Sequence, residues 1–463
     1  METSRDELFK VIDSAETVQY AEARFHKRIS SEIRIVGGDL EEARTSQIAG
    51  VGVRVLKNGA WGFSSTGDLS QKSIRGALSN AIAIAAVSAN GKKKKIKKLG
   101  RAKFAVGRFA VKVNDPLNNH SLEEKVKLVK ETEKLVRNFS PKIKSAICSF
   151  REMSDKKIIV NSDGALCEIS DSKPEFQVSA IASSSGEVIG TSESIGVTGG
   201  WKDLFARSSP EEMAKKASDT ALKLLTAKKP KGERATVVLN PGMVGLISHE
   251  AIGHMVEADF VLSGSMVSGK IGKKIASELV TLVDSGLSKG AAGITLVDDE
   301  GVLGQETVLI ENGVLKSYLH NRETAAIYDV ESTSNARAFE YTDEPIIRMR
   351  NTYIEAGNYG DEEIIKEVKH GYLLKGARNG QADANGEFMF GAQEAYRIEK
   401  GEVRDILRGV TISGNAFDTL KSVDAIGKRF MFDIGSGYCG KWQPAKVDGG
   451  GANLRCTAIV GGE

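Results

Sequence analysis

The chain alternates hydrophobic and polar residues over two long stretches, and both stretches are interrupted by glycines. From Tyr20 to Thr66, β-branched residues alternate with polar ones, and residues 145–200 repeat the pattern with turns at 162–164 and 185–186. Both stretches predict strands joined by short turns. Apolar residues with helical spacing predict helices at about residues 6–16, 71–89, 121–136, 210–227, 244–257 and 362–370. This order of elements predicts an α+β fold that is rich in strands.

A charged segment near the middle of the chain marks a domain boundary. The run 228–233 contains Pro230, one of only eight prolines, and separates a predicted helix from the buried strand Ala235–Leu239. A chain of 463 residues also exceeds what one hydrophobic core usually supports. We therefore predict two domains, an amino-terminal α+β domain over 1–230 and a carboxy-terminal domain over 231–463.

The composition excludes several classes of protein. With 41% hydrophobic and 27% charged residues, the chain is neither disordered, collagen-like nor a coiled coil. Its four cysteines form no disulfide framework, and the charged start METSRDELFK lacks the apolar run of a secretory signal. No apolar stretch approaches the roughly 20 residues that a membrane span requires. We therefore expect a cytoplasmic protein without a membrane partner.

Charge gives no support for nucleic-acid binding. The formal net charge is only +3, and the lysine tract 92–98 has no interleaved aromatic residue on which a base could stack. The tract is typical of a solvated loop, the alternative being a patch that binds phosphate, a membrane surface or another polyanion.

The main candidate for chemistry is an H-E-x-x-x-H motif from His249 to His254, directly after the strand Ala235–Leu239. Two imidazoles are suitable ligands for Zn2+, and Glu250 stands beside the first of them, where a carboxylate can take a proton from a metal-activated water. Pro241 is suited to the first position of the helix that would carry the motif.

The spacing of the two histidines has a structural consequence. Residues five apart on a regular α-helix point about 140° away from each other, so the rings would diverge. They converge if a π-bulge accommodates the extra residue, and Gly253 is a position where this distortion costs little. We therefore predict a π-bulge between His249 and His254. The alternative is a pair of histidines that never share a metal.

A zinc site needs at least one further ligand, and Cys439 is the best candidate. It lies in the run GSGYCG at 435–440, whose glycines allow the backbone to fold closely around an ion. The same letters spell the dinucleotide fingerprint G-x-G-x-x-G, but no helix follows as a Rossmann turn requires.

The other possible ligands have structural interpretations. Cys456 shares one face of an alternating strand with apolar neighbours, and the remaining two cysteines, Cys148 and Cys167, belong to the other predicted domain. His320 and His370 stay alternatives, although His370 would complement the dipole at the end of the predicted helix 362–370. Glu257 and Asp259 could fix an imidazole through a hydrogen bond or could simply end the helix.

Several segments together resemble one protein family. They are the histidine motif with its continuation MVEADF at 255–260, ASEL at 276–279, VDDEG at 297–301, RMRNTY at 348–353, GYCGK at 437–441 and GVGVRV at 50–55. With these segments the chain resembles the catalytic, TldD type of the TldD/PmbA (TldE) zinc metalloprotease family over nearly its whole length. The PmbA/TldE type lacks the histidine motif.

The resemblance implies a zinc peptidase that acts on unfolded or unstructured peptides, with a two-domain α+β fold. It implies that His249, His254 and Cys439 bind the metal, that Glu250 is catalytic, and that the second domain is the metal-binding catalytic one. It also implies a dimer enclosing the active site, either a homodimer or a heterodimer with a PmbA/TldE-like paralogue. The residues alone leave two alternatives: a metal-dependent small-amide (deformylase-like) hydrolase, or a non-enzymatic protein that binds a polyanion or a partner.

Overall fold

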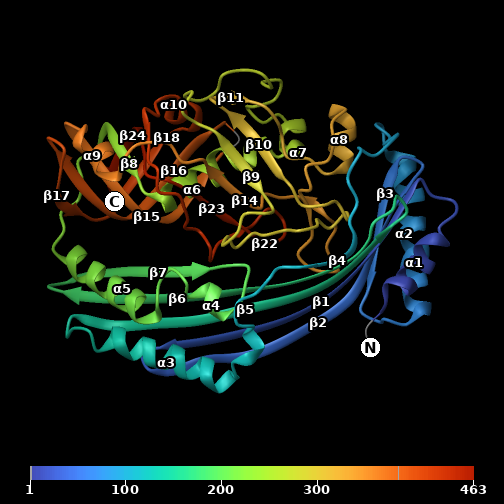
Figure 1. The fold of residues 1–463 in the computed structure, drawn as a ribbon, viewed down its shortest axis with the longest axis horizontal. Coiled ribbons are helices and arrows are strands. Elements are labelled where there is room, and N and C mark those ends of the chain that lie inside the picture. Colours follow the sequence, from blue (N-terminus) through green and yellow to red (C-terminus); the bar gives the residue numbers. More distant parts are fainter. Residues whose placement is uncertain (1–2, 384, 463) are drawn as a thin grey trace.

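A single curved sheet forms most of the first half of the chain (Figure 1). The computed structural model describes residues 3–383 and 385–462. The strands are β1 (Tyr20–Val36), β2 (Asp39–Lys57), β3 (Ala60–Thr66), β4 (Val106–Ala110), β5 (Ile143–Asn161), β6 (Leu166–Ser184) and β7 (Glu187–Gly196). Their order is β3-β2-β1-β5-β6-β4, and β7 pairs with β6. The two predicted stretches of strands and their turns are confirmed.

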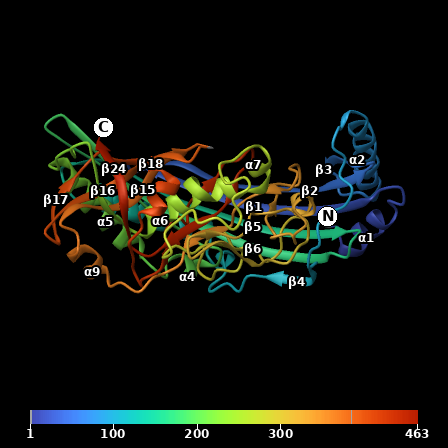
Figure 2. The same cartoon turned by 90° about the horizontal axis from the view of Figure 1, so that it is seen from above.

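Helices cover the convex face and one end of this sheet (Figures 1 and 2). They are α1 (Arg5–Asp13), α2 (Gln71–Gly91), η1 (Leu117–Asn119), α3 (Leu122–Arg137), α4 (Trp201–Leu204) and α5 (Pro210–Leu225). A serine side chain caps the start of α1, α2, α3 and α5. Leucine, valine and alanine faces of these helices pack on the sheet in two separate clusters. The four helices predicted in this half are confirmed.

A small closed barrel is the main sheet of the second half. Its strands are β8 (Glu233–Leu239), β15 (His370–Ala382), β16 (Glu387–Glu399), β18 (Val410–Asn415) and β24 (Leu454–Gly462), with β17 (Glu402–Leu407) and β19 (Ala425–Ile426) attached. β15 pairs with both β8 and β16, so the ring β15-β8-β24-β18-β16 closes.

A second sheet lies beside the barrel, in the order β11-β10-β9-β14-β23-β20. These strands are β9 (Leu282–Ser285), β10 (Glu306–Glu311), β11 (Val314–Leu315), β14 (Asn351–Ile354), β20 (Met431–Phe432) and β23 (Asp448–Gly451). Two short ribbons complete the strands, β12 (Ala336–Arg337) with β13 (Ile346–Ile347) and β21 (Tyr438–Cys439) with β22 (Ala445–Lys446).

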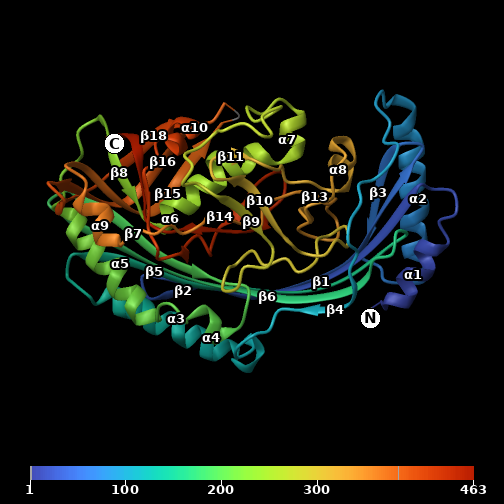
Figure 3. The same ribbon diagram turned by 45° about the horizontal axis from the view of Figure 1, so that its top comes forward.

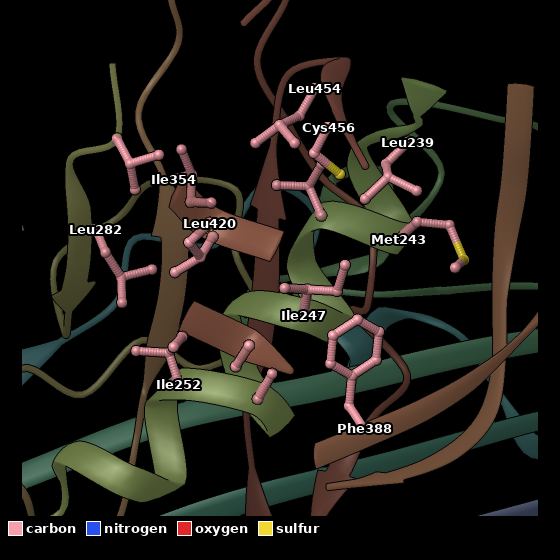
Figure 4. Close-up of a cluster of buried hydrophobic side chains, with 14 of the residues drawn as sticks. Leu239, Met243, Ile247, Ile252, Leu282, Ile354, Phe388, Leu420, Leu454 and Cys456 are labelled. Carbon is pink, nitrogen blue, oxygen red and sulfur yellow. The ribbon is translucent and has the colours of Figure 1, made fainter. Parts of the chain in front are cut away.

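The largest hydrophobic core surrounds the helical segment that follows β8 (Figure 4). This segment is α6 (Pro241–Leu246), η2 (Ile247–Gly253) and η3 (His254–Val256), followed by α7 (Ala258–Leu262). Met243 and Ile252 belong to a core that also contains Leu282, Phe388 and Leu454 from the surrounding sheets. The segment is therefore held on several sides both before and within the histidine motif.

The remaining helices are α8 (Arg322–Tyr328), α9 (Asp361–Lys366) and α10 (Ala416–Lys421). The predicted helix 362–370 is wrong at its end, because α9 stops at Lys366 and His370 begins β15. His370 Nε2 lies 3.0 Å from Glu233 Oε1, so it pairs with a carboxylate and not with a helix dipole. Sheet pairing with β16 from His370 onward outweighs the local helical preference.

The second half lies on the concave face of the large sheet (Figures 1 and 3). Buried ion pairs join the two: Lys157 of β5 to Asp299 at 2.7 Å, and Arg54 of β2 to Glu300 at 2.7 Å. The α+β class rich in strands is confirmed, while the boundary at 230/231 stays a prediction. Within residues 3–383 and 385–462, no helix is long and apolar enough to cross a membrane.

Candidate metal centre

A π-helical turn carries the histidine motif. The Asn240 side chain caps α6 by accepting from the backbone N–H of Met243, and Pro241 occupies the first turn as predicted. From Ile247 to Gly253 the helix widens to η2, a π-helix, and the N–H of His254 donates to the carbonyl of His249. The predicted π-bulge is confirmed, while the regular helix expected over 244–257 is replaced by α6, η2 and η3.

Gly253 is needed at this turn for a reason that differs from the predicted one. Its backbone is ordinary right-handed helix, with φ of −55°. A Cβ atom at this position would lie 2.0 Å from the Met349 sulfur and 3.1 Å from the Ser248 carbonyl oxygen. A side chain here would therefore require Met349 to move, so close packing, and not conformational freedom, is the constraint.

The turn brings His249 and His254 together with Cys439. One ligand atom from each residue lies within 4.8 Å of those of the other two. The Cys439 sulfur is 3.2 Å from His254 Nε2, and the two imidazole rings are nearly perpendicular, with centroids 5.2 Å apart. Among the residues that the structure describes, this is the one group of three histidine, cysteine or acidic side chains close enough to hold an ion.

Cys439 is positioned by a buried arginine. It lies in β21 of the ribbon β21–β22, and not in the open loop that its glycine neighbours suggested. The guanidinium of Arg348, which is fully buried, donates to the backbone carbonyls of Cys439, Lys441 and Gln443. These three hydrogen bonds hold the β21–β22 ribbon in place, so the position of the Cys439 sulfur is fixed.

A carboxylate orients His254 from the side opposite the candidate site. Glu257 is fully buried, and its Oε2 lies 2.8 Å from His254 Nδ1, which leaves Nε2 to face Cys439. Lys441 Nζ lies 3.3 Å from the same Glu257 oxygen and 2.6 Å from Asp259. Glu257 therefore has the place of the expected imidazole partner, whereas Asp259 pairs with Lys441.

Without a metal the site pairs an imidazolium with a thiolate, so a bound ion would have to displace the proton of His254. Burial opposes the charged form of His254, but Glu257 and Cys439 outweigh it and raise the pKa of His254 to about 10. Burial also opposes ionisation of Cys439, but the imidazoles of His249 and His254 lower the pKa of its thiol to about 3. The sulfur is therefore a thiolate at neutral pH, the form that binds metals.

The side chain of His249 supports the same conclusion. It is buried, yet neither ring nitrogen has a hydrogen-bond partner among the described residues. A buried polar group without a partner is unusual and requires an explanation. A metal ion held by one nitrogen of each imidazole and by the thiolate would give one of the two His249 nitrogens a partner, and this donor set is typical of Zn2+ with one position left open.

Glu250 lies beside these residues at the wall of a large groove. Its side chain is 32% exposed, and Oε2 is 3.9 Å from His254 Nε2. The groove has a volume of about 1260 Å³ and is lined by His249 and Glu250 together with residues of α5, β7, β15 and β16. His249 and Glu250 therefore border an open channel between the two halves of the chain.

The other cysteines and histidines lie elsewhere. Cys148, Cys167 and Cys456 are buried in strands, and burial raises the pKa of Cys456 to about 12. His320 is buried near Tyr318 and Tyr328, and burial lowers its pKa to about 4. None of them joins the candidate site.

Two supporting residues were missed by the sequence argument. Arg348 and Lys441 lie in the segments RMRNTY and GYCGK, which the sequence did not connect with a role for either residue. Each is a cation with almost no solvent exposure that contacts the segments around Cys439 or Glu257. Their burial could not be recognised from the sequence, since lysine and arginine are normally exposed.

Comparison with known proteins identifies the family. The PmbA/TldA metallopeptidase models match in three parts, domain 1 at residues 21–85, the central domain at 115–225 and the C-terminal domain at 232–451. A metalloprotease of Methanothermobacter thermautotrophicus is 35% identical to this chain, and the match covers 100% of both proteins. A zinc metalloprotease TldD homolog of Saccharolobus solfataricus is 29% identical, over 98% of this chain and 100% of that protein. The fold is similar to crystalline TldE from Thermococcus kodakarensis, with a TM-score of 0.78 and 20% identity over 99% of this chain and 100% of that one. The chain belongs to the PmbA/TldA metallopeptidase family.

Proposed function

We propose that this chain is a zinc-dependent peptidase that hydrolyses unfolded or unstructured peptides. The observation that carries the proposal is the convergence of His249, His254 and Cys439 next to Glu250, at the wall of an open groove. The name of the Saccharolobus solfataricus relative, a zinc metalloprotease, supports the choice of metal.

Each residue of the site has a defined task in this proposal. Bound at His249, His254 and Cys439, Zn2+ would act as a Lewis acid toward water and the peptide carbonyl. Glu250 accepts the proton of the attacking water and passes it to the leaving amine. Glu257 holds the ring of His254 so that Nε2 faces Cys439, and Arg348 holds the strand that presents Cys439.

The groove favours a peptide over a small amide. A volume of about 1260 Å³ exceeds the typical 300–1,000 Å³ of pockets for small molecules. β15 continues beyond Leu374, where its pairing with β8 ends, and residues 375–378 and 380 line the groove. We infer that a substrate adds to this edge as an extended strand, with its backbone hydrogen-bonded and its side chains alternating. A folded protein presents no such free strand.

We also propose that the active form is a dimer, either of two copies or with a PmbA/TldE-like paralogue. The shared fold with TldE is consistent with either pairing. Trp442, three residues after Cys439, is 79% exposed and lies near Phe260, which contacts His254. Such an exposed aromatic side chain beside the site is suited to contact with a second subunit. A cytoplasmic location belongs to the same proposal, since all four cysteines are free thiols.

The decisive experiment separates metal binding from turnover. Glu250→Ala should keep about one zinc per chain but lose at least 10²-fold in kcat for short unstructured peptides, because it removes the general base. Asp219→Asn, which changes another carboxylate of the groove lining, is the control and should keep its activity. Comparable activity of Glu250→Ala and wild type would refute the role of Glu250.

A panel of substrates tests the alternatives. Cleavage of N-acyl amino acids but not of peptides would indicate the small-amide hydrolase. Salt-sensitive polyanion binding that survives zinc removal, without hydrolysis, would indicate the non-enzymatic protein.

A further inference from the structure

A second, much smaller cavity lies between the large sheet and the second half of the chain. Its volume is about 60 Å³. One wall consists of residues from β1, β5 and β6, and the other consists of residues 294–297, 337–339 and 444–446. Neither the candidate metal ligands nor Glu250 lines it.

Positive charge dominates the lining of this cavity. Five cationic side chains border it, namely Arg28, Lys157, Lys173, Arg337 and Lys446. Two carboxylates, Asp155 and Asp171, also border it, and they pair with Arg28 and Lys173. Outside the lining, Asp299 pairs with Lys157 and Glu175 pairs with Lys446, each at 2.7 Å. Four of the five cations thus have a carboxylate partner.

Arg337 is the cation without one. Its guanidinium donates to the backbone carbonyls of Met349 and Lys446, and no carboxylate lies within ion-pair distance in the part of the chain that is described. Burial and the neighbouring Arg348 lower its pKa to about 10, so it remains a cation at neutral pH. Across the cavity, Nη1 of Arg28 has no hydrogen-bond partner, although the side chain is only 8% exposed.

Asp299 and Asp284 attract Arg337 only from beyond ion-pair distance, and a buried cation without a close counter-ion is costly. The surrounding donors are guanidinium and ammonium groups, which are the groups that bind carboxylate and phosphate oxygens most strongly. The volume of about 60 Å³ has room for a few water molecules or one small ion and is too small for a nucleotide.

We propose that this cavity is a binding site for a small oxyanion, either inorganic phosphate or a short carboxylate. The anion accepts hydrogen bonds from side chains of both halves of the chain, Arg28 and Lys173 on one side and Arg337 on the other. It also lies against Lys446 of β22, the strand that pairs with β21 and therefore with Cys439. Occupancy ties the ribbon that carries Cys439 to the large sheet.

The test is a thermal unfolding titration of the purified full-length wild-type protein. Inorganic phosphate or acetate replaces sodium chloride at constant ionic strength, so general screening stays the same. Binding to the folded state should raise Tm in a saturable way, with an apparent Kd in the millimolar range or below. Saturation with phosphate alone identifies the phosphate site, and saturation with acetate alone identifies the carboxylate site. The absence of a saturable change with either anion would overturn the proposal.

Substitutions in the cavity test whether the rise in Tm comes from anion binding at this site. Arg337→Met should weaken the apparent affinity at least tenfold, because it removes the cation without a carboxylate partner. Lys173→Met provides the same test if Arg337→Met does not fold. Arg151→Met is the matched control, since this half-exposed arginine of β5 pairs with Glu32 outside the cavity. Equal affinity in wild type and both cavity variants would also overturn the proposal, and the result does not depend on zinc or on peptide hydrolysis.

Discussion

Glu257 provides the sharpest test of how the candidate site is organised. Its carboxylate is fully buried, lies 2.8 Å from His254 Nδ1, and is the group that most raises the pKa of that imidazole. Glu257→Gln keeps the size of the side chain and its ability to accept a hydrogen bond, but removes the negative charge. The substitution therefore changes the electrostatic support of His254 with little change in packing.

The expected effect is a loss of zinc affinity. Removal of a carboxylate partner from a metal-binding histidine typically weakens the metal 10- to 100-fold, which is about 1.4–2.7 kcal/mol. The loss of zinc-binding free energy in Glu257→Gln should lie in the upper part of this range, because solvent screens the buried Glu257–His254 pair little. The buried Lys441 keeps Asp259 as an ion-pair partner, so the fold itself should survive.

Zinc affinity can be measured by competition with a chromophoric chelator at fixed pH, on protein that has first been freed of metal. Asp259→Asn is the matched control, since it removes a charge from the same Lys441 cluster at a residue that does not contact His254. The control should change zinc affinity less than threefold. Equal losses in the two variants, or no loss in Glu257→Gln, would refute the idea that Glu257 acts through His254.

Three further predictions follow from other parts of the chain. Cys439→Ser should lose most of its zinc in metal analysis, whereas Cys456→Ser should keep it, and the reverse order would contradict the ligand assignment. Gly245→Ala should lower the free energy of unfolding by about 1–3 kcal/mol, because a Cβ would lie 2.6 Å from the backbone of β23. Gly76→Ala, with open space around the position, should raise the free energy of unfolding by about 0.5–1 kcal/mol. Burial raises the pKa of Asp299, but two buried cations outweigh this effect and lower it from 3.8 to about 2. The charge of Asp299 therefore stabilises the fold by about 2 kcal/mol above pH 4, and this contribution disappears as the pH falls through 2. Urea unfolding of Asp299→Asn and wild type should therefore differ most at neutral pH and converge toward pH 2.

The sequence predicted the elements that depend on local pattern. Alternation identified the strands of the large sheet except β4, and helical spacing identified its helices. The five-residue spacing of the histidines predicted the π-helical turn, because only a widened helix lets both rings converge. Short strands such as β21 escaped prediction, since two residues carry no periodic signal.

Contacts between distant segments were beyond the sequence argument. The choice of Cys439 relied on exclusion of the other cysteines and on family resemblance, whereas its position depends on Arg348, about ninety residues earlier in the chain. His370 was misplaced for a similar reason, because its strand is defined by partners in β8 and β16. Pairing of this kind is set by the tertiary fold and overrides local preference.

The segment VDDEG at 297–301 shows how a motif can be diagnostic without touching the active site. Asp298 accepts hydrogen bonds from three backbone N–H groups of its own loop and of β12, Asp299 binds Lys157, and Glu300 binds Arg54. All three carboxylates are buried between the large sheet and the second half, where an unpaired charge would cost several kcal/mol. These contacts favour one relative position of the two halves, because both ion pairs form only when the halves are in that position. The groove lies between the same two halves, so we expect these ion pairs to help hold the spacing on which the groove depends.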